Sequence, residues 1–387
     1  MSAFKQESHK LLVIPGPIEV TDEVLYANAY PPVAHTSAEF IPVLGDSIRL
    51  TREVLYTKDA QIFLIAGSGT LGWDQTSANL VESGDNVLVL NSGYFGDSFT
   101  ECLRAYGAKV DEIRADFGNA ITQAQLEKAL AAKKYKLVAF THVDTSTAVL
   151  SDAKMIGETT RRVSPQTLVV LDGVCSVASE EIRMDAWGID VVLSASQKGL
   201  GAPPGLCIVA ASRKAITVFE KRVSPVAGYY ASWKKWIPVM NAYEAGKPMY
   251  FATPPVNLVR AYRQSLFEIT SGNVSLQERF ALHRETKARI TAAVKELGLR
   301  EVPQDKSISA NGMSAIYLPD GVGVADLVPR MAARGVIVTG GLHKDTKDKY
   351  FRIGHMGTTA VNKQRGDIDK VIAVLTEVVN EVRKQNA

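Results

Sequence analysis

Short runs of apolar residues alternate with amphipathic stretches between about residue 60 and residue 215. The apolar runs predict strands at Gln61–Ala66, Asn86–Asn91, Leu137–His142, Leu168–Asp172, Val191–Ser194 and Leu206–Ala210. The segments between them predict helices, as in Ala120–Lys133, where Ile121, Leu126 and Leu130 are the apolar positions. Apolar strands joined by helices indicate a sheet that is buried on both faces and mostly parallel. The pattern therefore predicts an α/β fold whose ligand lies beyond the carboxyl ends of the strands.

The pattern changes after residue 220. Lys221–Met249 is rich in aromatic residues and glycine with little periodicity, and Thr253-Pro254-Pro255 forms a stiff corner. A long helical stretch is predicted over roughly Asn257–Leu297, and mixed helix and strand patterns follow it. Because 387 residues exceed the size at which single cores usually stop growing, we expect two domains. The second, smaller domain is expected to start near residue 257.

Composition and charge argue against several classes of protein. Hydrophobic residues make up 46% and charged residues 22%, which is ordinary for a globular protein. The net charge of +3 has no basic block behind it, so neither nucleic acid nor a membrane surface is indicated. No apolar run approaches the ~18 residues of a membrane span.

The cysteines and the two ends of the chain bear on its location. Three cysteines far apart in the sequence predict neither a disulfide framework nor a metal site, and favour a reducing compartment. The N-terminus lacks a signal-peptide core, and the C-terminal residues 384–387 are not the serine-lysine-leucine peroxisomal address. We expect a cytoplasmic protein, with a mitochondrial address left open.

Lys198 and Asp172 are the first candidates for chemistry. Lys198 follows one apolar strand and precedes the stiff turn Gly199–Gly205, and Asp172 ends another apolar strand. A lysine and an aspartate at the ends of two buried strands are the pair that pyridoxal phosphate needs, one to form a Schiff base and one to keep the pyridine nitrogen protonated. Either residue alone is more often structural, since many strands end in aspartate and most lysines are solvated.

A glycine-rich turn supplies a candidate phosphate site. Gly67-Ser68-Gly69-Thr70-Leu71-Gly72 follows a strand and opens a helix, where free N–H groups favour an anion. The same residues match the dinucleotide fingerprint, so a dehydrogenase is the obvious alternative. That fingerprint expects an acidic residue at the end of the next strand, which here ends in Asn91-Ser92-Gly93.

Further candidates follow other strands. Phe95 could stack on a flat ring and Val174 could cover its other face, although core packing is the commoner role of an aromatic side chain. Thr145 could reach a ring oxygen, yet hydroxyls after strands usually form turns.

Motifs along almost the whole chain resemble those of the class V, fold-type I pyridoxal-phosphate aminotransferases, in particular the alanine–glyoxylate and serine–pyruvate enzymes. In order, the matching segments are Pro15-Gly16-Pro17, Gly67-Ser68-Gly69-Thr70, Thr141–Thr147, Asp172-Gly173-Val174, Ser196-Gln197-Lys198 with Pro203-Pro204-Gly205, Tyr250–Pro255 and Phe351-Arg352-Ile353-Gly354.

The resemblance implies a fold and a set of roles. It implies a large domain over residues 21–256 with a mostly parallel seven-stranded sheet, a small α/β domain over 257–387, and residues 1–20 packing on a homodimer. Lys198 would be the Schiff-base lysine and Asp172 the partner of the pyridine nitrogen, while Arg352 would hold the substrate carboxylate beside Gly16. Ser68, Gly69, Thr70 and Gln197 would face the phosphate, and Tyr250 and Thr253 would reach the phosphate of the neighbouring subunit.

The reaction that the resemblance implies is amino transfer from alanine to glyoxylate, with serine as an alternative donor. A cysteine desulfurase has histidine where Gln197 stands, and a phosphoserine aminotransferase uses a His-Arg pair where this chain has His35-Thr36. Two departures stand out. Phe95 occupies a position that is often tryptophan in relatives, and the His343-Lys344 pair has no physical account from sequence.

Overall fold

The computed structural model describes residues 6–385. Residues 1–5 of the predicted N-terminal segment and residues 386–387 of the C-terminal tetrapeptide lie outside the described part. Within residues 6–385, no helix is both long and apolar enough to cross a bilayer.

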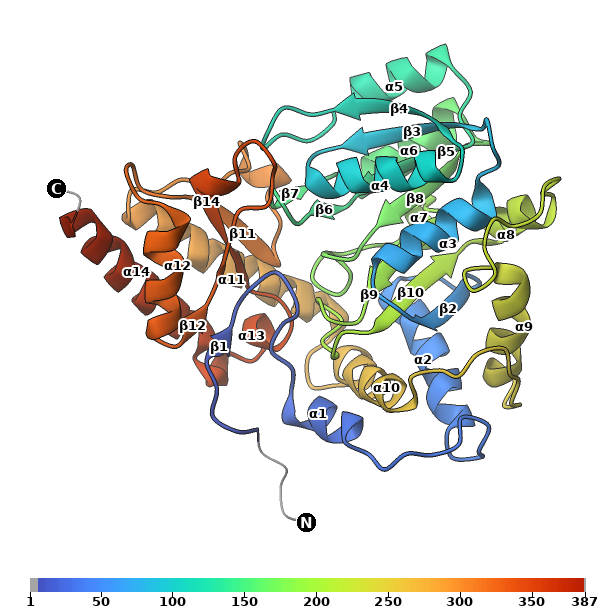
Figure 1. Cartoon of the computed structure of the whole chain (residues 1–387), viewed down its shortest axis with the longest axis horizontal. Helices are drawn as coiled ribbons and strands as arrows, with labels where there is room; N and C mark the ends of the chain where they lie inside the picture. Colours follow the sequence, from blue (N-terminus) through green and yellow to red (C-terminus); the bar gives the residue numbers. More distant parts are fainter. Residues whose placement is uncertain (1–5, 386–387) are drawn as a thin grey trace.

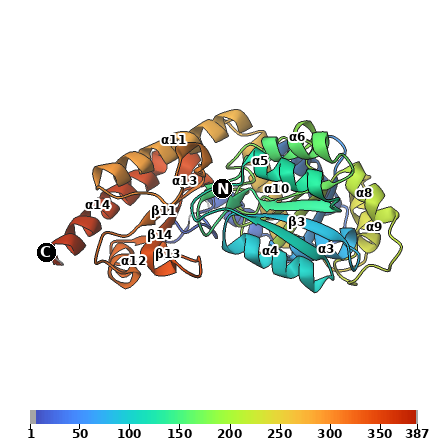
Figure 2. The same ribbon diagram turned by 90° about the horizontal axis from the view of Figure 1, so that it is seen from above.

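The large domain is built on the predicted seven-stranded sheet, with strand order β2-β10-β9-β8-β5-β3-β4 (Figure 1). Neighbouring strands are parallel except β10, which runs antiparallel to both β2 and β9. Helices α3 and α4 cover one face, and α5 and α6 cover the other (Figure 2). The strands are β2 (Gln61–Ala66), β3 (Asn86–Asn91), β4 (Lys109–Arg114), β5 (Leu137–Thr141), β8 (Leu168–Asp172), β9 (Val191–Ala195) and β10 (Leu206–Ala211). The helices are α1 (Asp22–Asn28), α2 (Ile41–Val54), α3 (Thr70–Leu80), α4 (Tyr94–Ala105), α5 (Gln123–Ala132), α6 (Ala153–Val163), α7 (Met184–Trp187), α8 (Arg213–Glu220), α9 (Trp233–Glu244) and α10 (Val256–Thr270).

Six of the seven strands coincide with the apolar runs in the sequence, and β4 does not. Its residues Lys109–Arg114 are mostly charged and only partly buried. The strand lies at the edge of the sheet and pairs only with β3. An edge strand has less surface to bury, and charged side chains there discourage pairing with other chains. It therefore lacks the apolar signal of the central strands.

The predicted helical stretch Asn257–Leu297 consists of two helices, so the prediction of one continuous stretch was wrong. Helix α10 ends at Thr270, and α11 (Leu276–Glu296) begins anew at Ser275, whose hydroxyl accepts from the Glu278 N–H in a capping box. Helix α10 packs against α1 and α2, and its buried residues belong to the core of the large sheet. We therefore propose that the small domain begins at about residue 275 rather than at 257.

The small domain has its own core, formed by the apolar faces of helices and short strands. Strands β11 (Met313–Tyr317), β14 (Tyr350–Gly354) and β13 (Thr339–Gly340) form an antiparallel sheet with β14 in the middle. Strand β1 (Leu11–Leu12) pairs with β12 (Val336–Ile337), so the described part of the N-terminal segment joins this domain. The helices are α11, α12 (Val324–Ala333), α13 (Thr358–Val361) and α14 (Asp367–Gln385).

Candidate active site

The candidate residues gather where the central strands of the large sheet end. Asp172 is the last residue of β8, and Lys198 follows β9 by three residues. Thr145 follows the short strand β6 (Val143–Asp144), which pairs with β7 (Val149–Leu150). Strands β5, β8 and β9 are parallel, so their carboxyl ends meet at one edge. Arg352 reaches this edge from β14, since its Nη1 donates to the Thr145 carbonyl at 3.1 Å.

Asp172 is a buried carboxylate that is held in place by two donors. Its Oδ1 accepts from the Val174 N–H at 2.9 Å, and its Oδ2 accepts from the indole Nε1 of Trp73 at 2.8 Å. Burial raises its pKa to about 6, against the lowering effect of these hydrogen bonds. A buried carboxylate of this kind is well suited to bind a protonated ring nitrogen, whose charge would stabilise its ionised form.

Lys198 lies against the N-terminal turn of the chain. Its Nζ donates to the carbonyl oxygen of Pro15. A Cβ at Gly16 would come within 2.3 Å of the Lys198 Cδ and 2.7 Å of its Nζ, so only glycine leaves room for the lysine there. Burial lowers the pKa of Lys198, which favours the neutral amine that a nucleophile or base requires. The structure thus places Gly16 beside the lysine.

The glycine-rich turn leads into α3 with space and donors for an anion. No side chain caps the first turn of α3, whose N-cap is Gly69. A Cβ at Gly69 would lie 2.6 Å from Val174, which places this turn beside the end of β8. Ser68 and Thr70 are exposed. The Oε1 of Gln197 is buried and has no hydrogen-bond partner among the described residues. The free N–H groups at the start of α3 can donate to a bound phosphate, and the carboxamide of Gln197 can do so through its NH₂ group.

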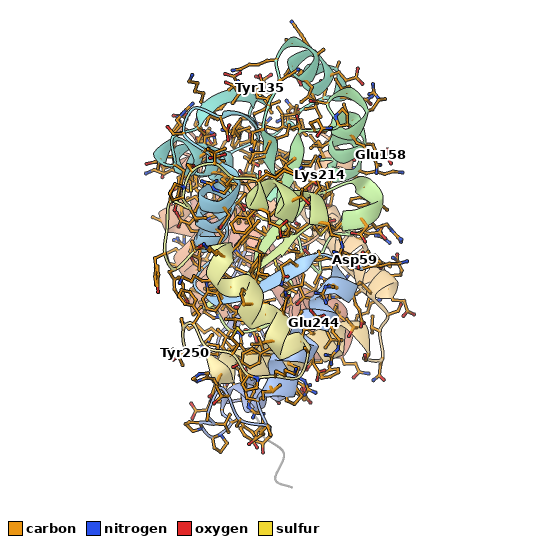
Figure 3. The ribbon with its side chains drawn as sticks, turned by 90° about the vertical axis from the view of Figure 1, so that its right-hand side faces the viewer. Asp59, Tyr135, Glu158, Lys214, Glu244 and Tyr250 are labelled. Atoms are coloured by element: carbon orange, nitrogen blue, oxygen red, sulfur yellow. The ribbon has the colours of Figure 1, made fainter. Side chains whose placement is uncertain are left out.

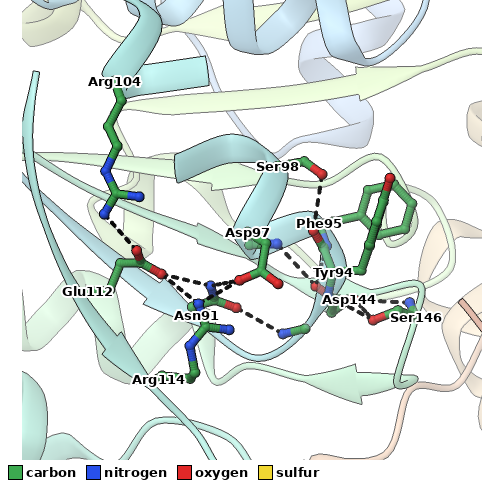
Figure 4. Close-up of polar contacts among 12 residues, drawn as sticks. Asn91, Tyr94, Phe95, Asp97, Ser98, Arg104, Glu112, Arg114, Asp144 and Ser146 are labelled. Atoms are coloured by element: carbon green, nitrogen blue, oxygen red, sulfur yellow. Dashed lines mark hydrogen bonds and ion pairs between the residues drawn. The ribbon is translucent and has the colours of Figure 1, made fainter. Parts of the chain in front are cut away.

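Asp144 fixes the start of the helix that carries Phe95 (Figure 4). Its Oδ2 accepts from the Phe95 N–H at 3.1 Å and the Gly96 N–H at 3.3 Å. Its Oδ1 accepts from the hydroxyl of Ser146 at 2.5 Å, and that hydroxyl in turn accepts from the Tyr94 N–H at 3.0 Å. Phe95 is partly buried, and its ring centroid lies 6.4 Å from that of Trp73.

Arg352 is 8% exposed at the centre of the small sheet. Its Nε donates to the Gly340 carbonyl at 2.9 Å, in addition to the bond from Nη1 to Thr145. Burial lowers its pKa, although a guanidinium remains charged at neutral pH. The two carbonyls hold the guanidinium in one orientation without neutralising its charge, which suits a carboxylate ligand.

Tyr250 and Thr253 are not joined to this cluster within one chain. Tyr250 is 63% exposed and lies near the edge of the face seen in Figure 3. Its ring packs against that of His35, with the ring centroids 5.3 Å apart. Thr253 is exposed as well. Among the described residues, no hydrogen bond or ion pair connects either side chain to Lys198 or Gln197.

Trp73 and Asp144 contribute to the site and were missed from the sequence. Each acts through a contact between segments far apart in the chain, Trp73 with Asp172 and Asp144 with Phe95. The sequence position of each residue, close to a motif, was a weak indication of a role in the site. Trp73 lies in the first turn of the helix after the glycine-rich segment, and Asp144 lies inside the Thr141–Thr147 motif.

The loop that contains His343 and Lys344 is held in place by contacts of His343 and Tyr350. The His343 ring packs edge-on against Phe117 at 4.8 Å, and the Tyr350 hydroxyl accepts from the His343 N–H at 3.0 Å. The same hydroxyl donates to the Ser146 carbonyl at 2.5 Å. The loop is thus tied to the residues that follow β6. Against the raising effect of burial, hydrogen bonds from Arg114 and Asn91 lower the pKa of Asp97, and the charge of Lys344 adds to this lowering.

Comparison with known proteins decides the family. The sequence profile of the class-V aminotransferases matches residues 21–353. The chain belongs to this family. An alanine–glyoxylate aminotransferase of Saccharomyces cerevisiae is 42% identical over 363 residues, covering 91% of this chain and 93% of the relative. An L-aspartate–glyoxylate aminotransferase of Paracoccus denitrificans is 29% identical, covering 91% and 87%. The crystal structure of an alanine–glyoxylate aminotransferase from Nostoc sp. superposes with a TM-score of 0.89 at 29% identity, covering 97% and 96%.

This class-V aminotransferase therefore has the fold-type I architecture and uses pyridoxal phosphate. The residues present fit that cofactor. The uncapped start of α3 and the NH₂ group of the Gln197 carboxamide could donate to the phosphate, and the buried Asp172 suits the ring nitrogen. When bound, the cofactor supplies an aldehyde for the amino group and a ring that withdraws electrons.

Proposed function

We propose that this aminotransferase moves the amino group of L-alanine to glyoxylate, giving pyruvate and glycine. The observation that carries the proposal is the 42% identity to the yeast alanine–glyoxylate aminotransferase over nearly the full length of both chains. The charges in the site agree with it. Arg352 is a buried cation that the structure brings to the same edge of the sheet as Lys198 and Asp172, where it can bind one carboxylate. Aspartate would bring a second carboxylate that these residues leave unpaired.

The proposed roles follow from the contacts. Arg352 binds the carboxylate that alanine and glyoxylate share, and Gly16 leaves room for the Lys198 side chain. The neutral amine of Lys198 removes the proton from the substrate Cα and would deliver it to the cofactor, so that the substrate can leave as a 2-oxo acid. Asp172, held by Trp73 and Val174, keeps the ring nitrogen of the cofactor protonated.

Donor competition tests the proposed substrate. With glyoxylate as acceptor, we expect kcat/KM for L-alanine to exceed that for L-aspartate by at least about a hundredfold, since one uncompensated charge costs several kcal/mol. Serine differs by one hydroxyl and is measured in parallel. A preference for aspartate or serine over alanine would contradict the proposed donor while leaving the family unaffected.

Replacement of Arg352 tests the proposed carboxylate site. Two charge-assisted hydrogen bonds, each contributing about 1.5–3 kcal/mol, should be lost in Arg352→Ala, and kcat/KM for alanine should fall by roughly a hundredfold or more. Arg352→Lys should not restore it, because an ammonium offers no planar two-point contact. The matched control is Arg300→Lys, since Arg300 lies over Tyr317 on the small domain. If alanine kinetics were unchanged in both Arg352 variants, the carboxylate would bind elsewhere.

We further propose a homodimer in which Tyr250 and Thr253 complete the phosphate site of the other subunit. Their exposure in the single chain supports this, as do the exposed aromatic side chains of Tyr229 and Tyr230. Such a cluster of exposed rings is typical of a protein interface.

Mixed dimers test the shared site. One subunit carries Lys198→Ala, and the other carries Tyr250→Ala with Thr253→Ala. In a shared arrangement, the hybrid has one intact site, and at limiting cofactor its activity should return to about half that of the wild type. If both residues served their own chain, the hybrid would be no better than the Tyr250/Thr253 variant.

The proposed location is the cytoplasm. All three cysteines are unpaired, and Cys175 and Cys207 are buried, as expected in a reducing compartment.

A further inference from the structure

Arg279 is a buried cation without an acidic partner. It lies in the first turns of α11 and is 7% exposed. Its Nε donates to the carbonyl of Ala178 at 2.9 Å, and its Nη2 donates to the carbonyl of Gly199, also at 2.9 Å. No carboxylate among residues 6–385 forms an ion pair with it. Burial lowers its pKa to about 10, partly opposed by Glu268, so the guanidinium stays charged at neutral pH.

Burying a charge is costly, and the hydrogen bonds to the two carbonyls offset part of that cost. The position of these carbonyls indicates a role beyond stability. The two carbonyls that Arg279 binds, those of Ala178 and Gly199, suggest a role in the active site.

The two carbonyls belong to the loops that carry the catalytic residues. Gly199 directly follows Lys198, and Ala178 lies in the turn that follows Asp172 at the end of β8. The two loops touch, because a Cβ at Gly199 would lie 2.4 Å from the Val177 carbonyl oxygen. Ala178 has φ of 65°, a left-handed conformation that non-glycine residues seldom adopt. One guanidinium thus bridges both loops at a strained position.

Arg279 also connects these loops to the small domain. Helix α11 packs with α13 and α14 (Figure 2). One turn after Arg279, His283 places Nδ1 2.7 Å from the Arg279 carbonyl, and its Nε2 accepts from the Gly357 N–H at 3.1 Å. Gly357 follows β14, the strand that carries Arg352. A continuous set of contacts therefore runs from the turn after Lys198 to the end of the strand with Arg352.

We propose that Arg279 is a positioning residue that holds the Lys198 turn against the Asp172 loop and in register with the small domain. The proposal rests on the catalytic roles proposed for Lys198 and Asp172. The Arg279 side chain forms no hydrogen bond with the side chains of Lys198 or Asp172 among residues 6–385, and it acts through the backbone of both loops. A displacement of about 1 Å in a catalytic group can reduce a rate about a hundredfold, so loss of this bridge should affect turnover more than substrate binding.

The test compares Arg279→Met, Arg279→Lys and the control Arg263→Met in the full-length holoenzyme. Arg263 is an arginine of the neighbouring helix α10 that pairs with Asp46. For Arg279→Met we expect a folded protein with a lower Tm, because two buried carbonyls lose their donor. Its kcat for alanine and glyoxylate should fall by roughly 10- to 100-fold, with KM for alanine changed by less than about threefold. The visible circular dichroism of the bound cofactor should change, and amide exchange in residues 196–202 should become faster. Arg279→Lys should recover part of kcat, and Arg263→Met should change none of the site readouts.

Three outcomes would overturn the proposal. One is a folded Arg279→Met variant with wild-type kcat. Another is a lower Tm with unchanged circular dichroism and amide exchange, which would indicate a purely structural role. If Arg279→Met does not fold, Arg279→Lys decides, and unchanged kcat, dichroism and exchange in that variant would also overturn it. Retained turnover in Lys198→Ala would instead refute the proposed role of the lysine, so the two failures are distinguishable.

Discussion

Lys198→Ala should lose multiple-turnover amino transfer by a factor of at least about 10⁴, because the change removes both the covalent attachment point and the general base. The Nζ of Lys198 is buried against Pro15 and Gly16, and its pKa is lowered by burial. Initial rates of pyruvate formation from alanine and glyoxylate give the turnover. Borohydride reduction and peptide mass spectrometry show whether the cofactor is still attached to the protein.

The matched control is Lys214→Ala, since Lys214 is a lysine of the same domain that binds Asp190 and the Thr167 carbonyl away from the site. The control should keep near-normal turnover and a borohydride-fixed cofactor on Lys198. Near-normal turnover in Lys198→Ala, with the cofactor fixed to another lysine, would refute the assignment.

Asp172→Asn should slow removal of the Cα proton by two to three orders of magnitude while weakening cofactor binding much less. An anion about 3 Å from the ring nitrogen contributes a few kcal/mol at an effective dielectric constant of about 20. Without it the nitrogen should lose its proton, and the ring then withdraws electrons less strongly. The deuterium exchange rate at the Cα of alanine and the Kd of the cofactor measure the two effects separately.

Asp190→Asn is the control, because Asp190 is also a buried carboxylate and accepts from the Val169 N–H instead of facing the site. It should leave Cα exchange nearly unchanged. Equal losses of exchange rate and cofactor affinity in Asp172→Asn would mean that Asp172 only anchors the cofactor.

Sequence reasoning succeeded where a residue's role follows from local pattern. The run Leu168–Asp172 coincides with β8, so the sequence placed Asp172 at a strand end, and the apolar run before Lys198 coincides closely with β9. Parallel strands then bring the two loops to one edge of the sheet. Uniformly apolar strands are predictable because both of their faces must be buried.

The remaining features depend on contacts that no local pattern encodes. Strand β4 lies at an edge where charged residues are tolerated, so it resembles a loop in sequence. Trp73 and Arg279 reach the site across about 100 residues of chain, as hydrogen bonds to Asp172 and to the carbonyls of Ala178 and Gly199. An aromatic side chain in a helix usually packs in the core, and a cation in a helix usually lies on the surface. Only the folded geometry shows that Trp73 and Arg279 contact the site instead.

The most direct test of the central claim is a two-step single-turnover measurement with ¹⁵N-labelled L-alanine. The purified holoenzyme is first incubated with the labelled alanine and no acceptor, then freed of small molecules and given glyoxylate. We expect one pyruvate per subunit in the first step and an equal amount of ¹⁵N-labelled glycine in the second. No pyruvate before glyoxylate is added, or glycine without the label, would contradict the central claim.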